Sequence, residues 1–218
     1  MIVRRGSPPD LAVDHLVVAA ASLASGTAWI EERLGVPASP GGKHVAMGTH
    51  NALVGLGPGV YLEVIAIDPT LAPPARPRWY ALDDPRMRAQ LAESPALIHW
   101  AARTRDIEAD AARSPVDLGA IMPMRRGEFH WRLTVPDDGH LPGRGLVPTL
   151  IQWSSRHPTN TLLDSGLRLT TLAGEHPEPA PVRTALAALG LSEMLKVTYG
   201  RVPRLAAMLR SPRGMVTL

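Results

Sequence analysis

The stretch VDHLVVAAASL (Val13–Leu23) recurs later in the chain as LIHWAARTRDI (Leu97–Ile107). In both copies a histidine, His15 or His99, stands near the start of an apolar run, and a Leu or Ile follows it at the same interval. Each copy then leads into a helical pattern. Internal repeats reveal the unit from which a fold is built, so we expect the chain to contain two copies of one structural unit.

The first copy predicts the unit β-α-β-β-β over residues 11–68. The run 13–20 has the length of a strand, and a helical pattern follows, with Ser22 placed as its N-cap and Gly35 as its end. Three short strand-like runs separated by glycine then predict an antiparallel meander: GGKHVAMG (41–48), THNALVGLG (49–57) and VYLEVIAID (60–68).

The second copy predicts the same unit over residues 94–158. Its expected elements are a strand at 97–104, a short helix at 106–113, and strands at 119–126, 128–136 and 146–153. The Pro-rich segment 69–93 connects the two units, and Asp84-Pro85 favours a short helix within it. Residues 159–218 contain strand and helix patterns without the histidine, so we expect a C-terminal extension that is a partial third module packed on the other two.

Composition is that of a globular protein and excludes several function classes. Of the 218 residues, 45% are hydrophobic and 20% charged. No apolar run is long enough to span a membrane and no signal-peptide pattern is present, which predicts a cytoplasmic protein that does not act at a membrane. Cysteine is absent, so thiolate nucleophiles and Cys-ligated metals are excluded.

The charge pattern and the motifs narrow the partners further. The formal net charge is only +3, and the 23 basic residues, nearly all Arg, are spread along the chain, so nucleic acid is not an expected partner. The sequence has no Gly-rich phosphate loop and no GxSxG motif, which argues against a nucleotide cofactor and against acyl transfer. A small organic molecule remains as the expected ligand or substrate.

Two β-α-β-β-β units, each with a histidine on its first strand, resemble the vicinal oxygen chelate superfamily of glyoxalases, bleomycin-resistance proteins and extradiol dioxygenases. The likeness is to its glyoxalase-like domains. It rests on YLE in the last strand of the first unit together with the preceding GTHN. The resemblance covers residues 11–158 most clearly, and it implies an α+β fold in which paired modules curl their sheets around a metal-centred cavity.

The resemblance also implies metal ligands on the first and fourth strands of each module. Carried over by position, these are His15 and Glu63 in the first module, and His99 and Gln152 in the second. Side chains alternate between the two faces of a strand, and we expect these four to meet on one inner surface. Such ligands suit Zn, Ni, Fe or Mn. The ion would activate a vicinal-oxygen substrate for lyase or isomerase chemistry, with Glu63 as the catalytic carboxylate.

Gln152 departs from the pattern of glyoxalase-type isomerases, which have at this position a Glu that also moves a proton. An amide cannot be a general base. One alternative is therefore a metal-free protein that sequesters a small molecule, as resistance and sensor members do. A second alternative is an Fe(II) extradiol-type dioxygenase, in which His50 joins His15 and Glu63 in a two-His, one-carboxylate set. A third is a vestigial pocket in a dimer scaffold.

Simpler structural roles stay open for the same residues. His15 and His99 suit core histidines bonded to backbone carbonyls. Glu63, on an apolar strand, would then need a salt bridge, with Arg103 or Arg132 as its partner.

Other polar side chains are candidates for contact with the substrate. Arg132 and His130 share strand parity, so both would face the cavity as anion-binding groups, whereas His44 and Asn51 would lie at its rim. Tryptophans on the opposite strand faces are expected to pack between helix and sheet: Trp100, Trp131 and Trp153. A homodimer also stays open, because paired modules assemble either within one chain or across two.

Overall fold

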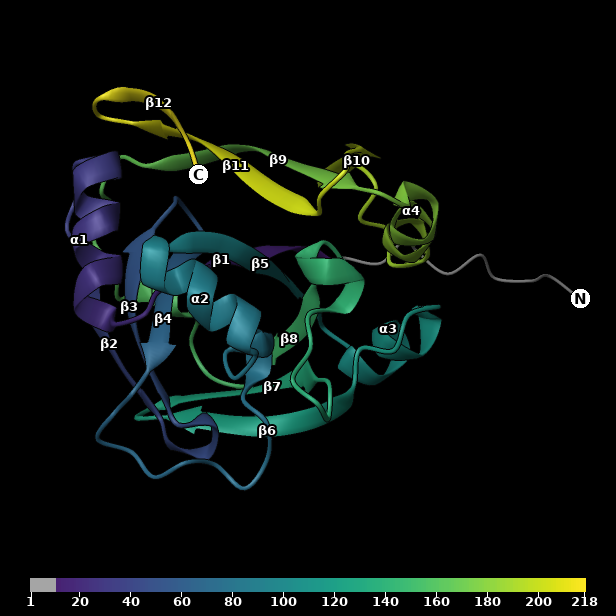
Figure 1. The fold of residues 1–218 in the computed structure, drawn as a ribbon, viewed down its shortest axis with the longest axis horizontal. Helices are drawn as coiled ribbons and strands as arrows, with labels where there is room; N and C mark the ends of the chain where they lie inside the picture. Colours follow the sequence, from purple (N-terminus) through teal and green to yellow (C-terminus); the bar gives the residue numbers. More distant parts are fainter. Residues whose placement is uncertain (1–10) are drawn as a thin grey trace, which may run out of the picture.

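The computed structural model describes residues 11–218, which form two β-sheets with four α-helices around them (Figure 1). The strands are β1 (Ala12–Ala19), β2 (Ser39–His44), β3 (Thr49–Gly55), β4 (Tyr61–Ile67), β5 (Ala96–Arg103), β6 (Ala120–Arg126), β7 (Phe129–Val135), β8 (Thr149–Trp153), β9 (Arg168–His176), β10 (Leu195–Tyr199), β11 (Arg204–Ser211) and β12 (Gly214–Thr217). The helices are α1 (Leu23–Leu34), α2 (Pro85–Glu93), α3 (Ile107–Arg113) and α4 (Pro179–Ala188).

The larger sheet confirms the paired-module fold. Its strand order is β2-β3-β4-β1-β5-β8-β7-β6. The first strands of the two modules, β1 and β5, are antiparallel neighbours at its centre, with Val17 opposite His99. Each of these two strands also pairs in parallel with the last strand of its own module, β1 with β4 and β5 with β8. The strands of the two modules therefore follow the same order from the centre of the sheet to its two edges, as a duplicated unit requires.

Helix α1 shows how local sequence places an element on the first module. Ser22 caps the helix in a reciprocal capping box with Ser25, and Gly35 ends it at φ 72°. Ile30 and Leu34 are fully buried beneath it. Gly26 lies at the closest approach, because a Cβ there would lie 2.5 Å from a methyl carbon of Val64 on β4.

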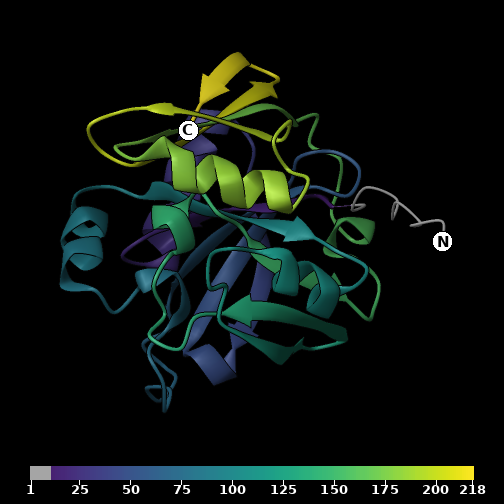
Figure 2. The same cartoon turned by 90° about the vertical axis from the view of Figure 1, so that its right-hand side faces the viewer.

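The C-terminal segment forms a separate four-stranded sheet with the order β10-β9-β11-β12. Its elements follow the β-α-β-β-β order once more, but the pairing differs. The first strand, β9, is parallel to the second, β10, through the crossover helix α4, whereas in the two modules the first strand pairs with the fourth. This sheet and α4 lie together on one side of the modules (Figure 2).

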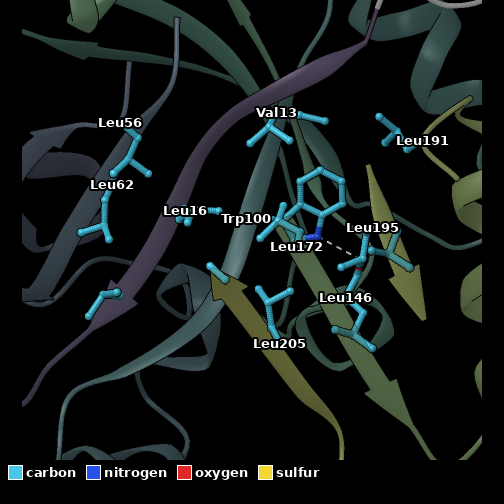
Figure 3. Close-up of a cluster of buried hydrophobic side chains, with 14 of the residues drawn as sticks. Val13, Leu16, Leu56, Leu62, Trp100, Leu146, Leu172, Leu191, Leu195 and Leu205 are labelled. Carbon is cyan, nitrogen blue, oxygen red and sulfur yellow. Dashed lines mark hydrogen bonds between the residues drawn. The ribbon is translucent and has the colours of Figure 1, made fainter. Parts of the chain in front are cut away.

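The main core lies between the two sheets (Figure 3). Leu16 on β1 and Trp100 on β5 project from the larger sheet, and Leu172 and Leu205 meet them from the smaller one. Trp100 is fully buried, and its indole nitrogen donates to the Leu146 carbonyl at 3.0 Å. Trp100 was expected to pack between helix and sheet, and the structure places it in the core between the two sheets.

The opposite face of the larger sheet carries a second apolar cluster. Val17, Ile65 and Ala101 project into it from the central strands. A short 3₁₀ turn, Trp79–Ala81, in the connection between the modules packs over the cluster. In residues 11–218 no helix is long and apolar enough to cross a membrane.

Candidate functional site

A small cavity opens on the face of the larger sheet that carries the second apolar cluster. Its volume is about 320 Å³ when the open solvent at its mouth is included. Strands of both modules and the Trp79–Ala81 turn contribute to its wall, which is largely aromatic but contains several ionisable groups. The lining residues are His15, His44, Tyr61, Glu63, Trp79, Tyr80, Arg126, Trp131, Leu133, Ile151 and Trp153.

A β-bulge in β1 brings Asp14 against His15. Val13 and His15 pair with consecutive residues of β5, Ala102 and Ala101, so Asp14 is the extra residue of the bulge. Bulges redirect side chains and are frequent beside active sites. Here the Asp14 carboxylate lies 2.8 Å from His15 Nδ1, and the other ring nitrogen of His15 is left toward the cavity.

Asp14 is fully buried and is surrounded by donors. Its second oxygen accepts from the Trp153 indole at 3.0 Å and lies 3.0 Å from His157 Nε2, with Arg103 at 3.5 Å. Burial alone would raise the pKa of Asp14, but hydrogen bonds from His15 and His157 outweigh it and hold that pKa well below its usual value. An ionised carboxylate only accepts hydrogen bonds, so His15 donates its Nδ1–H and turns Nε2 into the cavity.

Glu63 stands between two imidazoles. On paired strands β1 and β4, His15 lies opposite Tyr61 and Val17 opposite Glu63, which puts His15 and Glu63 on one face. Glu63 Oε2 is 3.7 Å from His15 Nε2, and Oε1 is 4.0 Å from His44 Nε2. The His15 ring also stacks on Tyr61, with centroids 4.7 Å apart.

An amide links Glu63 to a guanidinium. Asn51 Nδ2 donates to Glu63 Oε1 at 2.5 Å and lies 3.4 Å from His44 Nε2. Arg126 donates in turn to Asn51 Oδ1 at 2.8 Å. The buried carboxylate therefore has partial compensation from Arg126, transmitted through Asn51.

His44 is neutral at neutral pH. Burial lowers its pKa to about 4, against the opposing effect of nearby Glu63 and with a further lowering by Arg126. Its Nδ1 contacts the Thr49 hydroxyl at 3.1 Å. With Asn51 as the donor near Nε2, the Nε2 lone pair of His44 faces the Asn51 amide, and Glu63 Oε1 lies beside it at 4.0 Å.

The turn over the cavity is strained and contains an unsatisfied donor. Tyr80 and Ala81 have φ values of 60° and 54°, which are unfavourable for residues other than glycine and recur at ligand sites. The buried indole nitrogen of Trp79 has no hydrogen-bond partner among residues 11–218. An unpaired buried donor is costly, so this N–H is available to an oxygen atom of a ligand.

Comparison with known proteins identifies the family. A family model described as a glyoxalase-like domain matches residues 13–190, most of the chain. The chain belongs to this glyoxalase-like family. The resemblance to the vicinal oxygen chelate superfamily is thereby confirmed. None of the curated proteins searched matches the chain.

One solved structure with a TM-score above 0.5 supports the same fold, and two others resemble a shorter part of the chain. A hypothetical protein from Staphylococcus aureus aligns over 95% of this chain and 84% of its own, with 15% identity and a TM-score of 0.57. A methylmalonyl-CoA epimerase from Mycobacterium tuberculosis aligns over 70% of this chain and 91% of its own, with 17% identity and a TM-score of 0.43. A hypothetical protein from Bacillus halodurans aligns over 67% and 96%, with 12% identity and a TM-score of 0.43.

Within this glyoxalase-like domain the four side chains expected to meet do not all do so. His15 and Glu63 share the cavity, but His99 is engaged at both ring nitrogens. Its Nδ1 lies 3.1 Å from the Gly145 carbonyl, and Nε2 accepts from the Thr149 backbone N–H at 3.1 Å. These are the contacts of the core histidine that the sequence left open as the simpler role.

Gln152 points away from the cavity. Its neighbours Ile151 and Trp153 line the cavity, so the alternation of β8 turns Gln152 to the other face. There its oxygen accepts from the Ile107 backbone N–H at 3.1 Å, and its amide nitrogen donates to the Arg105 carbonyl at 2.9 Å. The expectation that Gln152 shares one inner surface with His15 is therefore wrong, because the neighbours of Gln152 on β8 occupy the face that turns to the cavity.

Two more expected cavity groups lie on the outer side of β7. Arg132 pairs with Glu108 and donates to Gln152 at 2.8 Å, and His130 is exposed. Trp131 lies between them in sequence and lines the cavity. The expectation that Arg132 and His130 face the cavity is therefore wrong, because β7 presents its odd-numbered residues there.

The tryptophan prediction is corrected for the same reason. Trp131 and Trp153 form part of the cavity wall, with ring centroids 5.2 Å apart, rather than helix–sheet packing. His50, the alternative ligand expected beside His15 and Glu63, does not line the cavity and lies 3.7 Å from Asp68. His44 occupies the position beside Glu63 that the sequence analysis considered for His50.

Several residues of the site escaped the sequence analysis. Asp14 directly precedes His15, and a carboxylate next to a candidate histidine is a usable signal for a supporting partner. Trp79-Tyr80, adjacent aromatics within the Pro-rich connection, was a further signal. Tyr61 belongs to the YLE motif, but nothing local marked Arg126 or His157, because their roles depend on contacts across strands.

The donor set can be tested against the divalent metal that the family implies. Among residues 11–218, no group of three or more His, Cys, Asp or Glu side chains has the arrangement of a metal site. The chemistry of the donors nevertheless fits an ion, because His15 and His44 both turn Nε2 toward Glu63. Each also has its Nδ1 engaged by an oxygen, as metal-binding histidines usually do. Binding would require the Asn51 amide to leave Glu63 Oε1.

Proposed function

We propose that the cavity of this glyoxalase-like domain binds a divalent metal through His15, His44 and Glu63, and that it acts as a lyase or isomerase on a small organic molecule with adjacent oxygen atoms. One observation carries the proposal. The imidazoles of His15 and His44 each have Nδ1 in a polar contact. Their Nε2 atoms lie 3.7 and 4.0 Å, respectively, from the buried carboxylate of Glu63. Such an electron-rich centre favours the binding of a metal cation.

The proposed ligand set modifies the one carried over from the resemblance. His15 and Glu63 are kept, and His44 replaces His99 and Gln152, whose polar atoms are engaged elsewhere. A divalent ion bound there would polarise a substrate oxygen and stabilise negative charge that develops on it.

The chain's own residues would bind and orient the substrate. The unpaired Trp79 N–H would donate to a substrate oxygen, and the rings of Trp131 and Trp153 would pack against a flat carbon skeleton. The Glu63 oxygen nearest His15 has no hydrogen bond to residues 11–218, so it is the group placed to accept a proton from the substrate.

A metal-free binding protein is the second candidate, and a specific contact favours it. The Asn51 amide already donates to Glu63 at 2.5 Å and lies 3.4 Å from His44. The amide therefore supplies part of the positive charge density that an ion would otherwise provide. In this case the aromatic cavity would sequester a ligand without turning it over.

Metal uptake separates the two candidates. Protein purified without chelators is dialysed in turn against Zn²⁺, Ni²⁺, Fe²⁺ and Mn²⁺, and bound metal is measured. We expect stoichiometric uptake of at least one ion by the wild type and strong loss in His15→Ala and Glu63→Ala. His130→Ala, an exposed histidine outside the cavity, is the matched control and should bind normally. A folded wild type that takes up none of the four ions would contradict the metal-dependent function and favour the binding protein.

A further inference from the structure

A second hollow lies outside the cavity, between the modules and the C-terminal sheet. It is the larger of the two, with a volume of about 1060 Å³ that includes open solvent at its mouth. The lining comes from α1, α2, the start of β5, the turn before β8 and the ends of β11 and β12. Figure 1 shows α1, α2 and the end of β12 on the same side of the molecule. None of the cavity-lining residues described above contributes to this groove.

Arginine dominates the charge of this groove. Arg33, Arg144 and Arg204 line it, and no Asp or Glu side chain does. None of the three forms an ion pair with a carboxylate of residues 11–218, although other arginines of the same chain do. Arg204 lies opposite Glu175 in the register of β11 and β9, yet no ion pair joins them. Three guanidinium groups from separate elements therefore share one concave surface whose lining contains no Asp or Glu side chain.

Two of these arginines are placed by local structure. The Arg33 guanidinium stacks over the Trp29 ring, 4.4 Å from its centroid, which restricts the side chain at the groove wall. Arg144 has a φ of 52°, between Gly143 and Gly145, which also have positive φ. A left-handed conformation is costly for a residue with a side chain, so glycine would suit this position better. The presence of an arginine at this position is explained if its guanidinium binds a ligand.

We propose that this groove binds a small organic oxyanion with at least two negative charges. Guanidinium groups match carboxylate and phosphate oxygens in bidentate geometry, and several of them together favour a multiply charged ligand. Gln90 and Ser94 add hydrogen-bonding groups to the lining, and Leu97 and Leu205 add apolar side chains against which the carbon part of the ligand would pack. The site is separate from the His15–Glu63 cavity, and it stands whether or not that cavity binds a metal.

Titration calorimetry with pyrophosphate and with citrate tests the proposal and distinguishes a phosphate from a polycarboxylate ligand. We expect at least one of the two to bind at low NaCl concentration, with affinity falling as salt screens the charges. The double variant Arg144→Gln, Arg204→Gln should lose roughly tenfold or more in affinity, because two charge-assisted contacts are removed. Both side chains are exposed, so circular dichroism should show an unchanged fold.

Arg86→Gln is the matched control. Arg86 is exposed on α2, does not line the groove and forms no side-chain ion pair with residues 11–218. Its substitution changes the net charge without touching the site, so affinity should stay close to that of the wild type. Failure of the wild type to bind either probe at low salt would overturn the proposal. Equal losses of affinity per charge in Arg86→Gln and in the groove variant would overturn it as well, since they would indicate nonspecific attraction.

Discussion

The Asp14 carboxylate lies 2.8 Å from Nδ1 of His15, the next residue in the chain, because a bulge in β1 turns both side chains to the same region. The contact determines which nitrogen of His15 faces the cavity. Hydrogen bonds keep Asp14 ionised despite its burial, so the proton of a neutral His15 is on Nδ1. The free lone pair on Nε2 is what both metal binding and proton transfer require.

Asp14→Asn should lower the metal affinity of the cavity without unfolding the protein. The substitution keeps the shape but removes the charge that orients His15, and losses of such supporting partners typically reduce metal affinity about 10- to 100-fold. The measurement is metal dialysis together with the ¹⁵N shifts of His15, which report its tautomer. Asp137→Asn, at an exposed loop position, is the control and should change neither. Unaltered His15 shifts in Asp14→Asn would contradict the orienting role.

His99 should make the protein sensitive to mild acid. Burial lowers its pKa to about 3 in the folded state, against an ordinary value of 6.5. Nε2 already accepts from the Thr149 backbone N–H, so a proton on that nitrogen would break this hydrogen bond. Between these two pH values the unfolded chain binds the proton and the folded chain does not. Stability therefore falls as pH decreases from about 6.5, and His44, with a pKa of about 4, contributes in the same direction.

The expected size of the combined loss is a few kcal/mol between neutral pH and pH values near the folded pKa of His44. Urea unfolding at a series of pH values measures it. His99→Gln should lower stability at neutral pH but flatten its dependence on pH, whereas exposed His130→Gln should leave the slope unchanged. A slope in His99→Gln as steep as in the wild type would assign the acid sensitivity to other groups.

Gly26→Ala should destabilise the protein although alanine favours helices. The new Cβ would lie 2.5 Å from a methyl carbon of Val64 and 2.8 Å from the Cβ of Ala20, so α1 has to move off the sheet. Such overpacking costs roughly 1–3 kcal/mol, which exceeds the helix-propensity gain of about 1 kcal/mol. Thermal unfolding is the measurement. The comparison variant is Ala28→Gly on the exposed side of α1, which should lose only the propensity term; a higher melting temperature for Gly26→Ala would refute the close contact.

The fold was predictable because its signals are local or periodic. The repeated histidine stretch marks the two central strands, and Ser22 and Gly35 bound α1 where the capping signals indicate. The C-terminal unit was less predictable. Its elements follow the expected order, but whether β9 pairs with β10 or with a later strand depends on tertiary packing and not on strand pattern.

The site was predictable only in its first module. His15 and Glu63 stand out in the sequence because they are ionisable side chains on strands whose other residues are nearly all apolar and buried. On β7 and β8 tryptophans alternate with polar residues, and sequence alone does not say which set faces inward. The polar set was assigned to the cavity, whereas the tryptophans line it. A one-residue error in parity moves every side chain of a strand to the other face.

Gln152→Ala tests that correction directly. The glutamine bridges the Ile107 backbone N–H at the start of α3, the Arg105 carbonyl and Arg132, so its loss should lower the free energy of unfolding by about 1–2 kcal/mol. Metal uptake should stay as in the wild type, because Gln152 does not reach the cavity. Glu63→Gln should give the opposite pattern, with metal uptake lost and the fold retained. Loss of metal from a folded Gln152→Ala would instead restore Gln152 to the ligand set and require β8 to present its other face to the ion.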